Sequence, residues 1–222
     1  MFDSYLRALK DRLGAPIAQR LVNVGPNAIS LLGLVAGINT ALFAYFGYYG
    51  VALAFWLVNR FLDGLDGLVA RIHNQQDDFG GYLDILSDFV VYAAVPIGLV
   101  LGSPSPSRYA ALIAMLAAFY INTASWMYLA AILEKRSARS DDTLTTIVMP
   151  SGLVGGFETI VFFSLFFIFP SQVTLLFSIF SALIIFTIFQ RLIWAKRVLN
   201  PVPVKGKINE NQYISPRIYS EE

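Results

Sequence analysis

Six stretches of mostly apolar residues divide this chain, and each is close to the length that crosses a bilayer as a helix. They cover residues 26–49, 51–72, 80–101, 108–133, 151–169 and 172–195. A spanning helix needs about 20 apolar residues, and it pairs its own backbone polar groups where no water can do so. The pattern predicts an all-α integral membrane protein with six transmembrane helices.

The two ends of the chain are more polar than these segments. Within residues 1–25, apolar side chains recur at helical spacing with basic residues between them: Phe2, Leu6, Leu9, Leu13, Ile17 and Leu21. This spacing is typical of an amphipathic helix in the membrane interface, and a soluble tail helix is the alternative. Gly14 and Pro16 can break that helix in two. Residues 200–222 are expected to form a polar tail after one membrane domain, residues 1–199.

Composition supports this interpretation and narrows the chemistry. Of the 222 residues, 56% are hydrophobic and 14% charged, with a mean hydropathy of +0.61. An ordinary soluble domain is far less apolar. The chain has no cysteine, which excludes a disulfide scaffold, a zinc–cysteine site and a thiol nucleophile.

The basic residues predict an orientation. They cluster before the first segment, after the second, between the fourth and fifth, and after the sixth, whereas the loops near residues 50 and 170 have none and the remaining loop has only Arg108. Lys and Arg are enriched in cytoplasmic loops. Both termini and the loop after the second segment are therefore expected to face the cytoplasm.

Four aspartates interrupt the second and third segments. Asp63 and Asp66 are three apart and Asp84 and Asp88 four apart, so on helices each pair shares one face. If residues 72–79 turn the chain back, the four carboxylates converge. Like charges so close must bind a proton or a cation, and hard divalent ions such as Mg²⁺ bind carboxylates together with phosphate oxygens. The sequence thus predicts one or two divalent ions and a phosphate-bearing substrate.

Eight residues stand at fixed spacing over residues 63–88: Asp63, Asp66, Gly67, Ala70, Arg71, Gly80, Asp84 and Asp88. This pattern resembles the signature of the class I CDP-alcohol phosphatidyltransferases and matches it at all eight positions. A looser resemblance covers the hydrophobic segments up to about Arg197. The GGYLDILSDFVVY and GGFET stretches are similar to a bacterial subgroup of unassigned acceptor.

The resemblance implies an activity. The enzyme would transfer the phosphatidyl group of CDP-diacylglycerol to the hydroxyl of an alcohol and release CMP, in phospholipid biosynthesis. It implies Mg²⁺ or Mn²⁺ as two ions, a homodimer, and the bacterial inner membrane with a cytoplasmic site. The implied metal ligands are Asp63, Asp66, Asp84 and Asp88, and Asp88 is also the implied general base.

The resemblance also implies contacts to the CDP group, by Asp66, Gly67, Ala70, Arg71, Gly80, Asn27 and Ser30. Each has a simpler structural explanation. Gly67 and Ala70 can serve close helix packing, Arg71 can extend to the interface, and Gly80 can start a helix. Asn27 and Ser30 can cap one.

The acceptor is the least determined part of the prediction. Glu158 in the fifth segment can bond the acceptor or pair with Arg191, and further positive charge for an acceptor phosphate can come from Lys135, Arg136 and Arg139. Members of the family that use inositol phosphate or glycerol 3-phosphate present basic residues beside this glutamate. The neighbours of Glu158 are not basic, so another small polar alcohol stays open. Within the second segment, Arg60 is expected to pair with one of the aspartates.

Two other classes of membrane protein use intramembrane acids. One is another metal-diphosphate transferase, an aspartate-rich prenyltransferase, which needs a second such motif. After Asp88 the chain has only Asp141 and Asp142 as further aspartates. The other is a cation-binding transporter, which usually has internal repeats; the sequence has no convincing repeat.

Overall fold

The computed structural model describes residues 14–137 and 152–200, and every regular element in those ranges is helical. Residues 14–20 form a helical segment. The elements that follow are α2 (Pro26–Tyr45), α3 (Tyr49–Ile72), α4 (Asp78–Gly102), α5 (Pro106–Ser137), α6 (Gly156–Ile168), the short 3₁₀ helix η1 (Pro170–Gln172) and α7 (Val173–Leu199).

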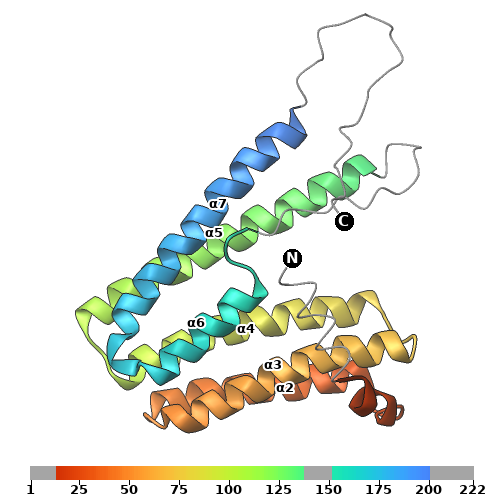
Figure 1. Ribbon diagram of the computed structural model, residues 1–222, viewed down its shortest axis with the longest axis horizontal. Coiled ribbons are helices and arrows are strands. Elements are labelled where there is room, and N and C mark those ends of the chain that lie inside the picture. The colour runs from red at the N-terminus through yellow and green to blue at the C-terminus, as the bar shows by residue number, and fades with distance from the viewer. Residues whose placement is uncertain (1–13, 138–151, 201–222) are drawn as a thin grey trace, which may run out of the picture.

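Helices α2, α3 and α4 lie side by side as one layer, and α5 and α7 run together across it (Figure 1). α6 lies between the two groups and contacts α3 and α7. α2 begins with Pro26 in its first turn, where the missing N–H costs no helical hydrogen bond. The short connection to α3 passes through Gly47, whose φ of +79° suits a residue without a side chain.

Glycines let α2 and α4 approach closely. A Cβ atom on Gly37 would overlap the Val91 side chain, and one on Gly98 or Gly102 would overlap the α2 backbone at Ala41 or Tyr45. Contacts of this kind are common where dispersion rather than the hydrophobic effect holds membrane helices together. The two helices are therefore interlocked along much of their length.

Aromatic side chains fill the core between the two groups of helices. Trp56 of α3 stacks on Phe163 of α6 with ring centroids 4.9 Å apart, and Phe163 also meets Phe180 of α7 edge-on at 6.3 Å. The indole N–H of Trp56 donates to Ser164 Oγ at 3.2 Å. This aromatic core holds α6 and α7 against the helix that carries Asp63 and Asp66.

By length and composition, four described helices can cross a membrane: α2, α4, α5 and the continuous η1–α7 unit. α3 has 24 residues but carries charged side chains, and α6 has only 13 residues. The predicted fifth segment, 151–169, is helical only from Gly156. Residues 152–155 instead bind α7, where Val154 N–H donates to Thr187 Oγ1 and Leu153 N–H to Gln190 Oε1, both at 3.0 Å.

The N-terminal segment is described only in part. The chain is helical over residues 14–20, so Pro16 does not break the helix there. Whether the helix breaks at Gly14 depends on the residues before it, which lie outside the described residues. Residues 21–25, predicted as the end of the interfacial helix, form a turn and a bend instead, before α2 starts at Pro26. Residues 1–13 of that predicted helix, and all but the first residue of the predicted tail 200–222, lie outside the described residues.

Candidate active site

The connection between α3 and α4 brings the two pairs of aspartates together. It turns at Asn74, whose φ is +54°, and His73 Nε2 lies 3.0 Å from the carbonyl oxygen of Ala18. Asp77 caps α4 by accepting a hydrogen bond from Gly80 N–H, a recurrent way to pair a free N–H at a helix start. The chain thereby reverses and α4 runs back beside α3.

Asp84 lies among the other three aspartates. Its carboxyl group lies close enough to those of Asp63, Asp66 and Asp88 to interact with them electrostatically. Two carboxyl groups in such contact require a proton or a cation between them. Within residues 14–137 and 152–200, no three Asp, Glu or His side chains form a group at metal-ligand spacing. The donor set is nevertheless chemically suited to a hard cation that takes further oxygens from a phosphate.

A cavity of about 190 Å³ opens beside Asp66 and Asp84, between the N-terminal end of α2, the C-terminal half of α3 and the first turns of α4. All seven residues predicted to contact the CDP group line it: Asn27, Ser30, Asp66, Gly67, Ala70, Arg71 and Gly80. Besides Asp84 and Pro26, which precedes Asn27 in the sequence, the wall contains four residues that were not predicted to line it: Gln75, Gln76, Asp77 and Gly81. The polar pair Gln75–Gln76 between the two halves of the motif was the available signal.

Ser30 and Asn27 tie α2 to this cavity. Ser30 Oγ donates to Asp66 Oδ2 at 2.5 Å, and Gly67 N–H donates to Asp66 Oδ1 at 2.5 Å. A Cβ on Gly80 would lie 2.8 Å from Asn27 Oδ1. The residue at the N-cap of α2 is Gly25, and no side chain caps this helix. The capping explanation of Asn27 and Ser30 is therefore wrong.

Gly67 leaves space on the cavity side of α3. The neighbouring atom that a Cβ there would approach is Arg71 Nη1, at 3.4 Å, on the same helix. No atom of another described helix lies within 4 Å of that position. The small side chain at Gly67 therefore serves the cavity and Arg71 rather than helix–helix packing.

Arg60 contacts the other two aspartates. Its Nη2 donates to Asp88 Oδ1 at 2.7 Å, and its Nη1 lies 3.7 Å from Asp63 Oδ2. The expected pairing of Arg60 with an aspartate of the motif is confirmed. Asp63 and Asp88 thus face the buried guanidinium group of Arg60, whereas Asp66 and Asp84 line the cavity.

The residues suggested for the acceptor lie elsewhere. Glu158 caps its own helix by accepting from Gly155 N–H at 2.9 Å, and Arg191 Nη1 donates to both oxygens of Asn122, so these two residues have different partners. Lys135 and Arg136 are exposed in the last turn of α5. Arg139 lies outside the described residues. Of the described residues among them, none lines the cavity.

Comparison with known proteins gives the family. The family model for CDP-alcohol phosphatidyltransferase matches residues 23–202, which include every element from α2 to α7. The chain belongs to the CDP-alcohol phosphatidyltransferase family. It is therefore an enzyme of that class, and the alternatives of a prenyltransferase and a cation transporter are set aside.

Sequence relatives of this phosphatidyltransferase differ in how much they share with it. "Inner membrane protein YnjF" of Escherichia coli K12 is 35% identical over 173 residues, which cover 78% of this chain and 82% of that protein. A CDP-diacylglycerol–serine O-phosphatidyltransferase of Mycobacterium tuberculosis is 36% identical over 86 residues, covering 38% and 30%. The archaetidylinositol phosphate synthase of Pyrococcus horikoshii is 31% identical over 99 residues, covering 41% and 48%.

Solved structures share the fold. The phosphatidylinositol phosphate synthase PgsA1 of Mycobacterium tuberculosis, with CDP-DAG bound, superposes with a TM-score of 0.66 at 22% identity, over 83% of this chain and 94% of that one. The same enzyme in complex with manganese and citrate gives a TM-score of 0.64 over 82% and 88%.

Proposed function

We propose that this enzyme transfers the phosphatidyl group of CDP-diacylglycerol to the hydroxyl of a small polar alcohol and releases CMP. The observation that carries the proposal is the cavity between α2, α3 and α4, where the seven residues assigned to the CDP group meet Asp84. The related PgsA1 binds CDP-DAG. In our assignment Arg71 pairs with a phosphate of the donor, and the cytidine end lies along the small residues Gly67 and Ala70.

Asp63, Asp66, Asp84 and Asp88 would hold two divalent ions, Mg²⁺ or Mn²⁺. The closeness of the Asp84 carboxyl group to the other aspartates supports this assignment, because a cation between carboxylates offsets their repulsion. The related PgsA1 has been solved with manganese. When bound, such ions would neutralise the diphosphate and the departing CMP.

Asp88 would act as the general base. The alcohol oxygen forms a bond to the phosphorus that carries the diacylglycerol, the bond from that phosphorus to the CMP oxygen breaks, and the alcohol proton passes to Asp88. Asp88 lies one helical turn beyond Asp84 on the same face of α4. Asp88 Oδ1 accepts a hydrogen bond from Arg60 Nη2 at 2.7 Å.

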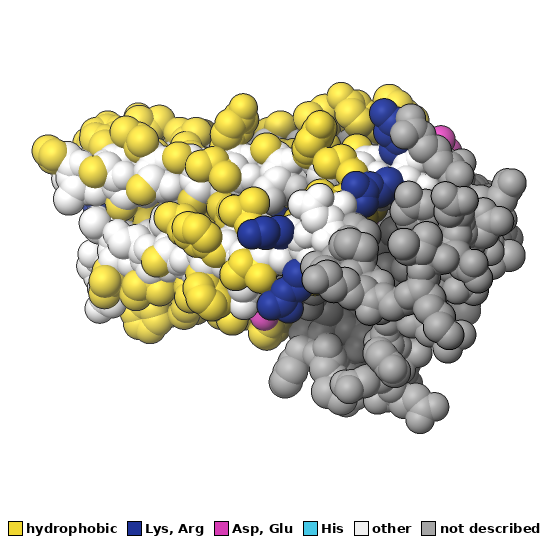
Figure 2. Space-filling view, turned by 90° about the horizontal axis from the view of Figure 1, so that it is seen from above, with side chains coloured by type: hydrophobic (Ala, Val, Ile, Leu, Met, Phe, Trp, Pro, Cys, Tyr) yellow, Lys and Arg dark blue, Asp and Glu magenta, His cyan; other side chains and the backbone are white. Residues whose placement is uncertain are grey.

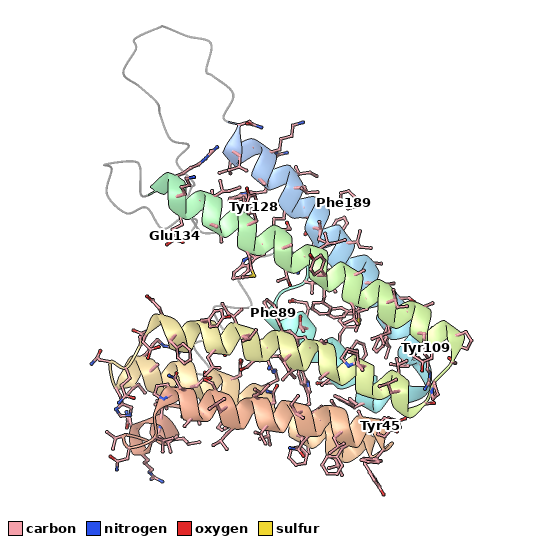
Figure 3. The ribbon with its side chains drawn as sticks, turned by 180° about the vertical axis from the view of Figure 1, so that it is seen from behind. Tyr45, Phe89, Tyr109, Tyr128, Glu134 and Phe189 are labelled. Atoms are coloured by element: carbon pink, nitrogen blue, oxygen red, sulfur yellow. The ribbon has the colours of Figure 1, made fainter. Side chains whose placement is uncertain are left out.

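We also propose six membrane crossings, with both termini and the site facing the cytoplasm of a bacterial inner membrane. α3 and α6 would complete the four clear spans, and residues 1–25 would lie along the interface. Lys and Arg gather toward one end of the visible face in Figure 2, while hydrophobic side chains cover the other. Tyr45 and Tyr109 mark one end of the bundle and Glu134 the other (Figure 3). The gathering of Lys and Arg toward one end agrees with their enrichment on the cytoplasmic side, and tyrosines are common at either membrane interface.

The acceptor would be glycerol 3-phosphate, an inositol phosphate or another small polar alcohol. The relatives include a CDP-diacylglycerol–serine O-phosphatidyltransferase and an archaetidylinositol phosphate synthase. The alcohols to be tested should therefore include phosphorylated and unphosphorylated ones. The candidates for contacting the acceptor remain Glu158, Arg191, Lys135, Arg136 and Arg139.

We assign the membrane domain to residues 1–199 and expect a homodimer. Light scattering of the detergent-solubilised enzyme would test the oligomeric state.

Release of CMP tests the proposal. Purified enzyme would be incubated with CDP-diacylglycerol, Mg²⁺ or Mn²⁺, and in turn glycerol 3-phosphate, inositol, inositol 1-phosphate, serine and choline. Release with one alcohol that Asp88→Asn abolishes would name the acceptor and support the base. Metal-dependent binding of the CDP-lipid without release would point to an untested alcohol, and no binding at all would refute the proposed donor.

A further inference from the structure

Arg60 lies deep in the helix layer, with 8% of its surface exposed. Each nitrogen of its guanidinium group has a partner. Nε donates to Asn59 Oδ1 at 2.8 Å, Nη1 to the Tyr92 hydroxyl at 2.9 Å and Nη2 to Asp88 Oδ1 at 2.7 Å. Because the guanidinium group is planar and its donors point in fixed directions, these three partners hold it in one orientation.

The surroundings hold this orientation from several directions. The guanidinium carbon lies 4.8 Å from the Trp56 ring centroid and 5.2 Å from that of Tyr92, at distances typical of cation–π contacts. Asn59 is itself fixed, because its side-chain amide donates to the Gly33 carbonyl of α2 at 2.8 Å. Arg60 is thus anchored to all three helices of the layer.

Tyr92 closes a triangle with Arg60 and Asp88. Its hydroxyl accepts from Arg60 Nη1 at 2.9 Å, and Arg60 Nη2 in turn donates to Asp88, so one guanidinium group joins the hydroxyl and the carboxylate. On its other side Tyr92 lines an apolar cavity of about 280 Å³ between α4 and α5, together with Phe89 and Phe119. Electrostatic contacts in such apolar surroundings are strong and strongly directional.

We propose that Arg60 is a positioning residue, which acts through Asp88 by holding that carboxylate in the orientation that accepts the proton of the alcohol. Asn59 and Tyr92 complete the support. The inference rests on the proposed role of Asp88 as the base. It differs from a purely stabilising ion pair because it assigns the effect to the reaction step and not to binding of the CDP-lipid.

Single variants separate the effect on the reaction step from effects on binding and folding. Arg60→Gln is expected to lower kcat about 100-fold, a loss typical of supporting residues, with KM for CDP-diacylglycerol changed less than about 3-fold, since uniform binding is kept. Arg60→Lys should recover part of the rate, because an ammonium group can contact Asp88 but cannot reproduce the fork. Arg108→Gln is the matched control: this arginine bonds carbonyl groups at Ser103 and Pro170, away from the aspartates.

A double-mutant cycle decides whether Arg60 acts through Asp88. If it does, Arg60→Gln combined with Asp88→Asn is no slower in residual CMP release than Asp88→Asn alone. Rate losses that multiply would overturn the inference, and so would an Arg60→Gln enzyme that loses CDP-lipid affinity but keeps kcat.

Different results refute the role of Asp88 as base and the role of Arg60 as positioning residue. Full activity of Asp88→Asn would refute the role of Asp88 and, with it, that of Arg60. If Asp88→Asn is inactive but Arg60→Gln is fully active, the role of Asp88 as base stands and only the positioning role of Arg60 is refuted. If Arg60→Gln does not fold, Tyr92→Phe provides the same cycle, with an expected loss of about 10-fold in kcat at unchanged KM.

Discussion

Ser30 near the start of α2 donates a 2.5 Å hydrogen bond to the carboxylate of Asp66 on α3, 36 residues later in the chain. Asp66 is 5% exposed and also accepts from its neighbouring Gly67 N–H. The contact joins α2, which has no charged side chain, to the acidic motif on α3. It fixes one wall of the cavity that Ser30 and Asp66 line.

Replacing Ser30 should weaken this wall. Ser30→Ala removes a hydrogen bond to a charged group, which is worth about 1.5–3 kcal/mol, so we expect kcat/KM for CDP-diacylglycerol to fall at least about 10-fold. Steady-state CMP release measures it. Ser178→Ala is the control, because Ser178 is exposed and bonds only its own helix at Thr174; an equal loss in both variants would contradict the assignment.

Gly80 sets the width of the cavity. In Gly80→Ala the new methyl group would lie 2.8 Å from Asn27 Oδ1 and 3.1 Å from Asp77 Oδ1. Overpacking of this kind costs about 1–3 kcal/mol, and we expect KM for the CDP-lipid to rise about 10-fold. Gly50→Ala, where no atom lies within 4 Å of the added carbon, should leave KM unchanged. A normal KM in Gly80→Ala would argue against a tight fit at this position.

Removal of divalent metal should abolish CMP release, and added Mg²⁺ or Mn²⁺ should restore it. Loss of an outer-shell partner alone weakens metal sites about 10–100-fold, so Asp84→Asn should raise the metal concentration for half-maximal activity about 100-fold or more. Asp78→Asn is the control on the same helix, since Asp78 is exposed in the first turn of α4. Identical metal titrations for Asp84→Asn and the wild type would exclude Asp84 as a ligand.

Phe163 should carry much of the stability of the aromatic core. It is fully buried and its ring meets those of Trp56, Tyr92 and Phe180. Phe163→Ala is expected to destabilise the protein by about 3–5 kcal/mol, measured by denaturant unfolding in detergent micelles. Phe189→Ala removes the same side chain from an α7 position that is 59% exposed and should cost far less. Similar losses of stability in the two variants would contradict the prediction, because they would mean that neighbouring side chains fill the space left by Phe163.

Local spacing was sufficient to predict that the aspartates of α3 and α4 lie near one another. The i,i+3 and i,i+4 intervals fix which side chains share a helix face, and eight residues between two apolar segments suggest a reversal, so Asp63 and Asp84 could be expected to meet. A buried arginine needs a partner, which made the pairing of Arg60 with an aspartate predictable. These inferences depend only on helix geometry and the cost of unpaired charge.

The start of the fifth segment shows what spacing cannot reveal. Residues 152–155 are apolar enough to continue a helix, yet their backbone N–H groups bond Thr187 and Gln190 of α7. Glu158 was expected to meet a substrate or an arginine, and it completes the cap of α6. The first outcome depends on partners more than 30 residues away in the sequence. The second depends on where α6 begins, because Glu158 can accept from Gly155 N–H only when the helix starts at Gly156.

The glycine contacts between α2 and α4 have a consequence for how such enzymes diversify. Because Gly98 and Gly102 bring the α4 backbone against Ala41 and Tyr45, these two helices cannot slide or rotate without a clash. α5 and α7 pack mainly on each other, and no described residue of either lines the cavity beside Asp66 and Asp84. Substitutions in this second helix pair can therefore accumulate while the cavity walls built by α2, α3 and α4 stay the same.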